Sequence, residues 1–75
     1  MFIQHGHLAF EHVHAGFYSA RSEWTGESYT VRTRPRGDGW MAIAGSYAIT
    51  TGMALNEAMA SCLATDKRIE SESYE

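Results

Sequence analysis

The fold is decided by one alternating stretch, SYTVRTR at Ser28–Arg34, and by the turn sequences that flank it. Two large side chains, Tyr29 and Val31, alternate with polar residues, and a period of two is typical of a strand with one buried face. Thr25-Gly26 precedes the stretch and Pro35–Gly39 follows it. Proline and glycine favour tight turns, so we expect the chain to reverse direction at both segments.

Further strands are expected beyond these two turns. Phe17–Trp24 is rich in aromatic and small residues, and Trp40–Ala44 is a mainly apolar run that either stops at Gly45 or continues to Ile49. The sequence therefore predicts a three-stranded antiparallel β-meander over residues 17–50. Residues 1–16 follow neither a helical nor a strand period, and we expect either a fourth, N-terminal strand or a short helix there.

The lengths of the two turns predict how the strands pair. A two-residue turn at Thr25-Gly26 places Ala20 opposite Val31, and a five-residue turn at 35–39 places Arg34 opposite Trp40. One face of the sheet then carries Tyr18, Ala20, Tyr29, Val31, Met41 and Ile43. The other face carries Phe17, Ser19, Arg21, Thr30, Arg32, Arg34, Trp40, Ala42 and Ala44.

A C-terminal helix is predicted over residues 51–66. Thr51 is a suitable N-cap, and at about 100° per residue one side of the helix is apolar. That side collects Leu55, Ala58, Met59, Cys62 and Leu63. Asp66 would fall on the same side, so we expect the helix to end near Thr65 and residues 67–75 to form an acidic, flexible tail. The expected whole is one α+β domain, residues 1–75, with the helix on the apolar face of the sheet.

The composition is that of a small globular domain. The chain has 75 residues, of which 44% are hydrophobic and 20% charged, and its net charge is −3. This charge does not favour nucleic acid or an anionic membrane as partner. Cys62 is the single cysteine, residues 1–7 lack a signal-peptide pattern, and no stretch approaches 18 apolar residues. We expect a cytoplasmic protein, and five arginines against one lysine favour a GC-rich bacterial or phage genome.

Four histidines form the most unusual local feature. His5, His7, His12 and His14 make two His-x-His pairs, and residues two apart on a strand share a face. Such pairs could chelate a divalent metal, with Glu11 adding an oxygen. The alternatives are a polar segment facing water and a pH switch. Because no Cys-x-x-Cys or His-Glu-x-x-His spacing supports a metal site, we predict no metal ligands and no cofactor.

Catalytic motifs are absent from the sequence. It contains no Gly-rich phosphate loop, no Gly-x-Ser-x-Gly elbow and no paired carboxylates. Cys62 falls on the apolar side of the predicted helix, where a thiol behaves as a small hydrophobe. We therefore expect a protein that is not an enzyme.

A binding surface is predicted on the sheet face that carries the arginines. In the expected register Arg34 lies beside Trp40, and Arg36 is close by at the turn. Arginine and aromatic side chains are the usual anchors of protein interfaces. The predicted partner-binding residues are Phe17, Arg21, Arg32, Arg34, Arg36 and Trp40. The alternative is a solvated face on which long arginine side chains cover the alanines beneath them.

The order of elements over residues 17–66 resembles the double-stranded-RNA-binding domain. That family grips phosphate with lysines at the start of its last helix, whereas Gly52–Ala58 has no base here. The same stretch is similar to the helix start of HicB-type antitoxins through Leu55, Glu57 and Ala58, without that family's turn at Pro35–Trp40. In size, acidity and lack of a catalytic motif the chain also resembles phage-encoded inhibitors such as anti-CRISPR proteins.

We therefore expect a small binding protein that occludes a site on a larger bacterial protein or nucleoprotein complex, in the manner of a phage or mobile-element inhibitor of a bacterial defence complex. A nucleic-acid-binding or antitoxin-like module that uses the same arginines is the first alternative. A histidine-based metal-binding protein is the second. Homodimerisation is a further expectation, because a chain of this length with an open edge strand gains from pairing.

Overall fold

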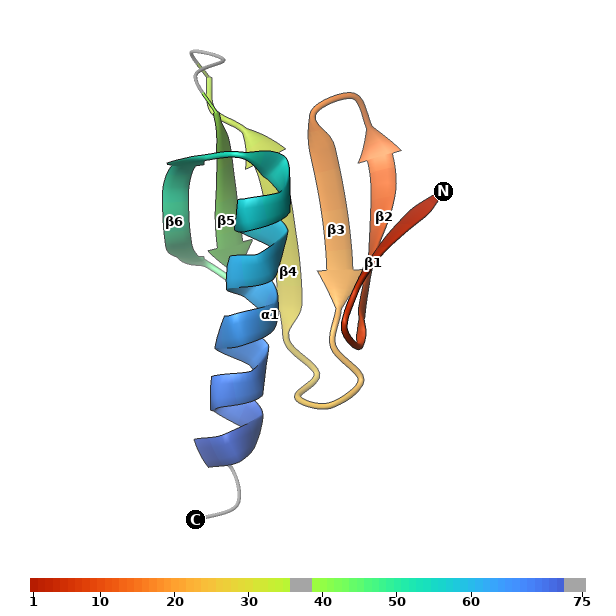
Figure 1. Ribbon diagram of the computed structural model, residues 1–75, viewed down its shortest axis with the longest axis vertical. Helices are drawn as coiled ribbons and strands as arrows, with labels where there is room; N and C mark the ends of the chain where they lie inside the picture. Colours follow the sequence, from red (N-terminus) through yellow and green to blue (C-terminus); the bar gives the residue numbers. More distant parts are fainter. Residues whose placement is uncertain (36–38, 73–75) are drawn as a thin grey trace.

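The structure is a computed structural model that describes residues 1–35 and 39–72. In this part of the chain, six antiparallel strands are followed by one helix (Figure 1). The strands lie side by side in chain order, so the sheet is a simple meander. The elements are β1 (Phe2–His5), β2 (Leu8–His14), β3 (Phe17–Arg21), β4 (Ser28–Thr33), β5 (Trp40–Ala44), β6 (Tyr47–Met53) and α1 (Leu55–Glu72). The predicted α+β class is confirmed, although the sheet has twice the three strands that the sequence indicated.

Residues 1–16, which the sequence left open between strand and helix, form the β1–β2 hairpin. Gly6 has a φ of +58° at the first position of its two-residue turn, a conformation that suits the primed turns of hairpins. Leu8 and Phe10 are buried and alternate with more exposed neighbours. The pairing of β2 with β3 then shifts between His12 and His14, which leaves Val13 as an extra residue. Because of this bulge, the alternation of buried and exposed residues along β2 is interrupted, so the sequence of residues 1–16 does not show a regular strand period.

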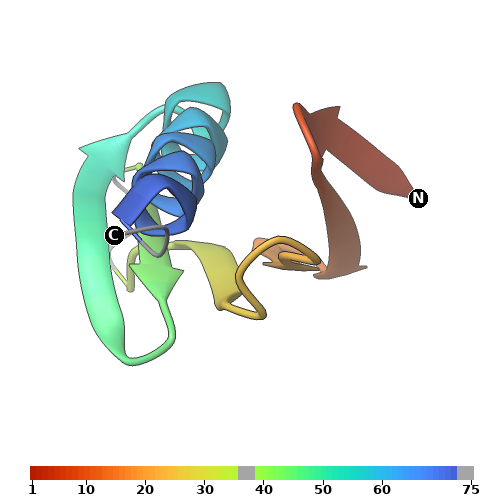
Figure 2. The ribbon, with the colours of Figure 1, turned by 90° about the horizontal axis from the view of Figure 1, so that it is seen from below.

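The sheet curls around the helix. Figure 2 shows α1 above the part of the sheet formed by β4–β6. At the other edge of the sheet, the β1–β2 hairpin bends up towards the level of the helix. The β1–β2 hairpin therefore does not cover the sheet face that points away from α1. The core lies between the sheet and the helix and consists of Leu8, Phe10, Ala20, Tyr29, Val31, Ala42, Ala44, Ala58, Met59 and Cys62.

The observed strand register differs from the prediction at both turns. Ala20 pairs with Tyr29 instead of Val31, a shift of two residues that keeps the same faces. At the second turn Val31 pairs with Ala42 instead of Ile43, and this slip of one residue exchanges the faces of β5. The small side chains of Ala42 and Ala44 therefore lie in the core, where they let α1 approach the sheet. Met41 and Ile43 point to the other face.

The helix is longer than predicted and begins later. Thr51 is part of β6 instead of an N-cap, and the first helical hydrogen bond runs from the N–H of Ala58 to the carbonyl of Ala54. At its other end α1 continues to Glu72, so residues 67–72 are helical and not a flexible tail. The predicted end near Thr65 was wrong because Asp66, although fully buried, has hydrogen-bond donors around its carboxylate.

Candidate functional site

The face of the sheet that points away from α1 is called here the open face. Residues paired across antiparallel strands share a face, so the pairing places Phe17, Arg32 and Met41 in one row across β3, β4 and β5. The next row is Ser19, Thr30 and Ile43. The open face therefore carries the half-buried apolar side chains of Phe17, Met41 and Ile43, and the exposed residue Arg32 lies between Phe17 and Met41.

Basic side chains gather on this face. Arg21 pairs with Ser28 on it and is exposed. The backbone N–H of Arg34 donates to the carbonyl of Gly39, which extends the β4–β5 pairing by one position and puts Arg34 on the side of Arg32. Glu11, which pairs with Ser19, lies on the same face. In a chain of net charge −3, the described part of this face therefore combines Arg21, Arg32 and Arg34 with Glu11.

Trp40 does not belong to the open face, which corrects the predicted site. It pairs with Thr33 and lies on the side of α1, where its ring centroid is 5.7 Å from that of Tyr18. It also packs against the core. The predicted Arg34–Trp40 pair is not formed, because the register slips by one residue. Phe17, Arg21, Arg32 and Arg34 do lie on one side of the sheet, and Arg36 lies outside the described residues.

A hollow of about 320 Å³ lies at the β1–β4 part of the open face. Phe2, Glu11 and Arg21 contribute to its lining, and Phe2 is 64% exposed. The hollow offers space for a partner side chain beside one acid and one base.

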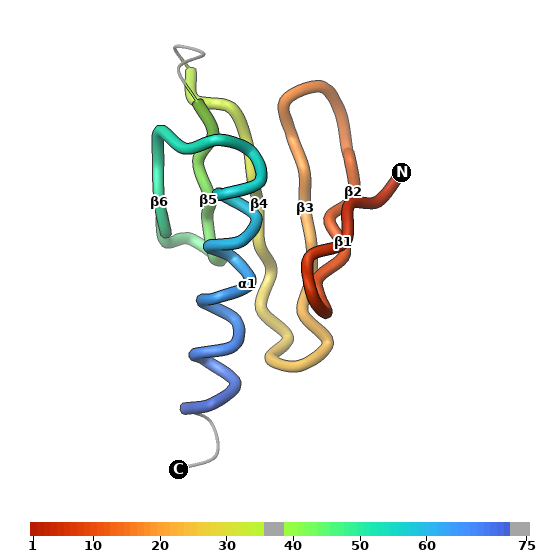
Figure 3. Tube along the Cα trace, in the orientation of Figure 1, coloured from red at the N-terminus to blue at the C-terminus, as the bar shows by residue number. Residues whose placement is uncertain are grey.

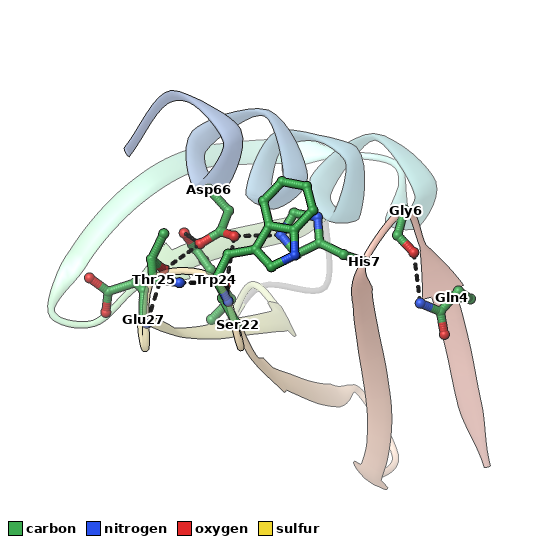
Figure 4. A network of polar contacts seen from close by, with 9 residues as sticks. Gln4, Gly6, His7, Ser22, Trp24, Thr25, Glu27 and Asp66 are labelled. Atoms are coloured by element: carbon green, nitrogen blue, oxygen red, sulfur yellow. Dashed lines mark hydrogen bonds and ion pairs between the residues drawn. The ribbon is translucent and has the colours of Figure 1, made fainter. Parts of the chain in front are cut away.

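The sequence analysis missed a polar network around Asp66. This residue has no exposed surface, yet its two carboxylate oxygens have four partners. Oδ2 accepts from Ser22 Oγ at 2.6 Å and lies 2.6 Å from His7 Nε2. Oδ1 accepts from Thr25 Oγ1 at 2.6 Å and from the Tyr29 hydroxyl at 2.7 Å. Figure 4 shows His7 and the β3–β4 loop converging on the carboxylate below α1.

The electrostatics of this network favour an ionised carboxylate. Burial alone would raise the pKa of Asp66, but the bonds from Ser22, Thr25, His7 and Tyr29 outweigh it and lower the pKa to about 2. For Tyr29, burial and the bond to Asp66 raise the pKa of the phenol well above its usual value. Asp66 is thus a fixed negative charge that joins α1 to the β1–β2 turn, the β3–β4 loop and β4.

Trp24 covers this network from outside. Its ring stacks on that of His7, with centroids 3.5 Å apart and planes 3° apart, although the residue is 52% exposed. Ser22 Oγ accepts from the backbone N–H groups of Trp24 and Thr25, at 3.1 and 3.2 Å, and so fixes the loop. The Ser22 hydroxyl proton is directed to Asp66 and not to a substrate, so the arrangement holds the chain together instead of activating a nucleophile.

Each of the four histidines lies against a different aromatic ring. The pairs are His5–Phe10, His7–Trp24, His12–Tyr18 and His14–Phe17. Because of the bulge in β2, His12 points to the side of α1 and His14 to the open face, so this His-x-His pair cannot chelate as a unit. Among residues 1–35 and 39–72, no group of three or more His, Cys, Asp or Glu side chains could hold a metal ion.

Comparison of the chain with protein-family models, with curated proteins and with solved structures gives no match. Within the described ranges, α1 is not apolar enough to cross a membrane.

Proposed function

We propose that this protein is a binding protein that docks its open face on an acidic surface of a larger protein and thereby occludes a site there. An inhibitor of a bacterial complex, of the kind phages and mobile elements encode, would act in this way. The proposal rests on one observation: Phe17, Arg32 and Met41 form a row across three strands on a face that no other element of the described chain covers.

The mixture of side chains on the open face supports a protein partner. Protein interfaces combine an apolar centre with charged residues at the rim, and arginine and aromatic residues are enriched in them. Phe17, Met41 and Ile43 supply the apolar part, and the exposed Arg21 and Arg32 supply the charges. Two exposed arginines beside Glu11 are a weak phosphate-binding array in an acidic chain, so nucleic acid fits this face less well.

The test is a pull-down from a nuclease-treated bacterial lysate with matched variants. We expect wild type to retain a partner that is lost with Arg21→Glu/Arg32→Glu. The control Lys67→Glu/Arg68→Glu makes the same change of charge on α1 and should retain the partner. Folding of each variant is checked by its amide NMR spectrum.

Two results would contradict the proposal. Equal capture by the open-face variant and the control would place the contact elsewhere on the molecule. Capture that disappears after nuclease treatment, and that weakens steeply with salt when purified nucleic acid is added, would favour a nucleic-acid-binding module instead.

A further inference from the structure

A second concave region lies on the other side of the sheet, between the later turns of α1 and the hairpin that joins β5 to β6. It is a cavity of about 500 Å³, within the size range of small-molecule sites. In Figure 1 and Figure 3 the helix continues past the end of the sheet here. The cavity shares no side chain with the row of Phe17, Arg32 and Met41.

Apolar residues form one part of the cavity lining, which is called here the floor. Ala44, almost fully buried, and Ile49, which packs against the core, contribute from the sheet. Ile69 contributes from α1 and Ala48 from β6. Tyr47 stands at the margin and is 79% exposed. An aliphatic group placed on this floor would cover apolar surface that water now contacts, which is favourable at roughly 25 cal/mol per Å².

The polar margin of the cavity carries charges of both signs. Glu27 is held in place from two directions: its backbone N–H donates to Thr25 Oγ1 at 3.1 Å, and its carboxylate Oε1 accepts from the N–H of Ser28 at 3.1 Å. Thr25 is in turn bound to Asp66. Arg68 lines the cavity from α1, two residues beyond Asp66.

These two charges do not neutralise each other. In the part of the chain that the structure describes, Glu27 and Arg68 are not joined by an ion pair. A cavity that offers a carboxylate and a guanidinium above an aliphatic floor is complementary to a molecule with an ammonium group, a carboxylate and an apolar body.

We infer that this cavity binds a small zwitterion with an apolar side chain, the chemistry of an aliphatic α-amino acid or a short peptide of such residues. Glu27 receives the ammonium group and Arg68 the carboxylate. Ile49, Ile69 and Ala44 contact the side chain. This site is independent of the docking function proposed for the open face.

The experiment is an amide NMR titration with four probes. L-leucine carries all three features, L-leucinamide lacks the carboxylate, N-acetyl-L-leucine lacks the ammonium group, and glycine lacks the side chain. We expect saturable shifts with L-leucine at the amides of Glu27, Ala48 and Arg68, and at least tenfold weaker binding of the other three probes.

Matched variants locate the site. Arg68→Gln removes the guanidinium and Glu27→Gln removes the carboxylate; each should weaken binding of L-leucine at least tenfold. Lys67→Gln, at the neighbouring exposed position of α1, should bind as wild type. The inference is overturned by the absence of saturable shifts with L-leucine, by equal binding of N-acetyl-L-leucine, or by shifts that are centred on other parts of the chain.

Discussion

Nε2 of His7 and Oδ2 of Asp66 lie 2.6 Å apart, although 59 positions separate the two residues in the chain. Their contact joins the first turn of the sheet to the last element of the fold. Ser22, Thr25 and Tyr29 bring the middle of the chain to the same carboxylate. A domain of this size buries a small core, so a network that connects four segments contributes a large share of its stability.

Removal of the Asp66 carboxylate should destabilise the fold strongly. Asp66→Ala leaves Ser22, Thr25 and Tyr29 without their acceptor, and each unsatisfied buried group costs about 1–3 kcal/mol. We expect a loss of at least about 3 kcal/mol, measured by urea unfolding. Lys67→Ala, at the exposed neighbouring position, should change the free energy of unfolding by less than about 0.5 kcal/mol. Similar values for both variants would contradict a central role of the network.

The same carboxylate predicts how stability depends on pH. The pKa of Asp66 is about 2 in the folded chain, whereas an unfolded aspartate has a pKa near 3.9. Because the folded value is the lower one, the stabilisation is complete above about pH 4 and is lost as the pH falls towards 2. About 2 kcal/mol should disappear over this window. Urea unfolding at pH 5, 3 and 2 should show this loss in wild type and a smaller one in Asp66→Asn.

The stack of His7 on Trp24 should contribute a measurable coupling. Parallel rings with centroids 3.5 Å apart are in direct contact, and aromatic pairs typically contribute about 0.5–1.5 kcal/mol beyond the area they bury. A double-mutant cycle with His7→Ala and Trp24→Ala measures this coupling, because it subtracts the effect of each single substitution on the free energy of unfolding. Additive effects of the two substitutions would mean that Trp24 only lies over the network.

The register of β4 and β5 can be tested with two substitutions at adjacent positions. Ala42 is fully buried beneath α1, so Ala42→Leu overpacks the core and should destabilise by about 1–3 kcal/mol. Met41 is half-buried on the open face, so Met41→Glu should be better tolerated. In the register expected from turn lengths, Met41→Glu would instead be the more destabilising substitution. Thermal unfolding of both variants therefore distinguishes the two registers.

These contrasts show how far sequence reasoning reaches in this chain. The central strands and the apolar side of the helix follow from periodicity, and both were predicted. The five-residue turn expected at 35–39 placed Met41 and Ile43 on the buried face. The structure instead buries Ala42 and Ala44, since the closeness of α1 decides which side chains fit. The position of Asp66 on the apolar side of the helix indicated that its carboxylate would need polar partners. These partners come from three segments that are distant in the chain, and no local sequence pattern indicates them.

Cys62 provides a probe of global unfolding. The residue is fully buried, and burial raises the pKa of its thiol to about 12, so almost no thiolate exists at neutral pH. A thiol-specific reagent at pH 8 should therefore react only with molecules in which α1 has left the sheet. We expect slow labelling of wild type and faster labelling of Asp66→Ala, in proportion to its lost stability. Rapid labelling of native wild type, at a rate unaffected by Asp66→Ala, would mean that α1 opens locally without breaking the Asp66 network.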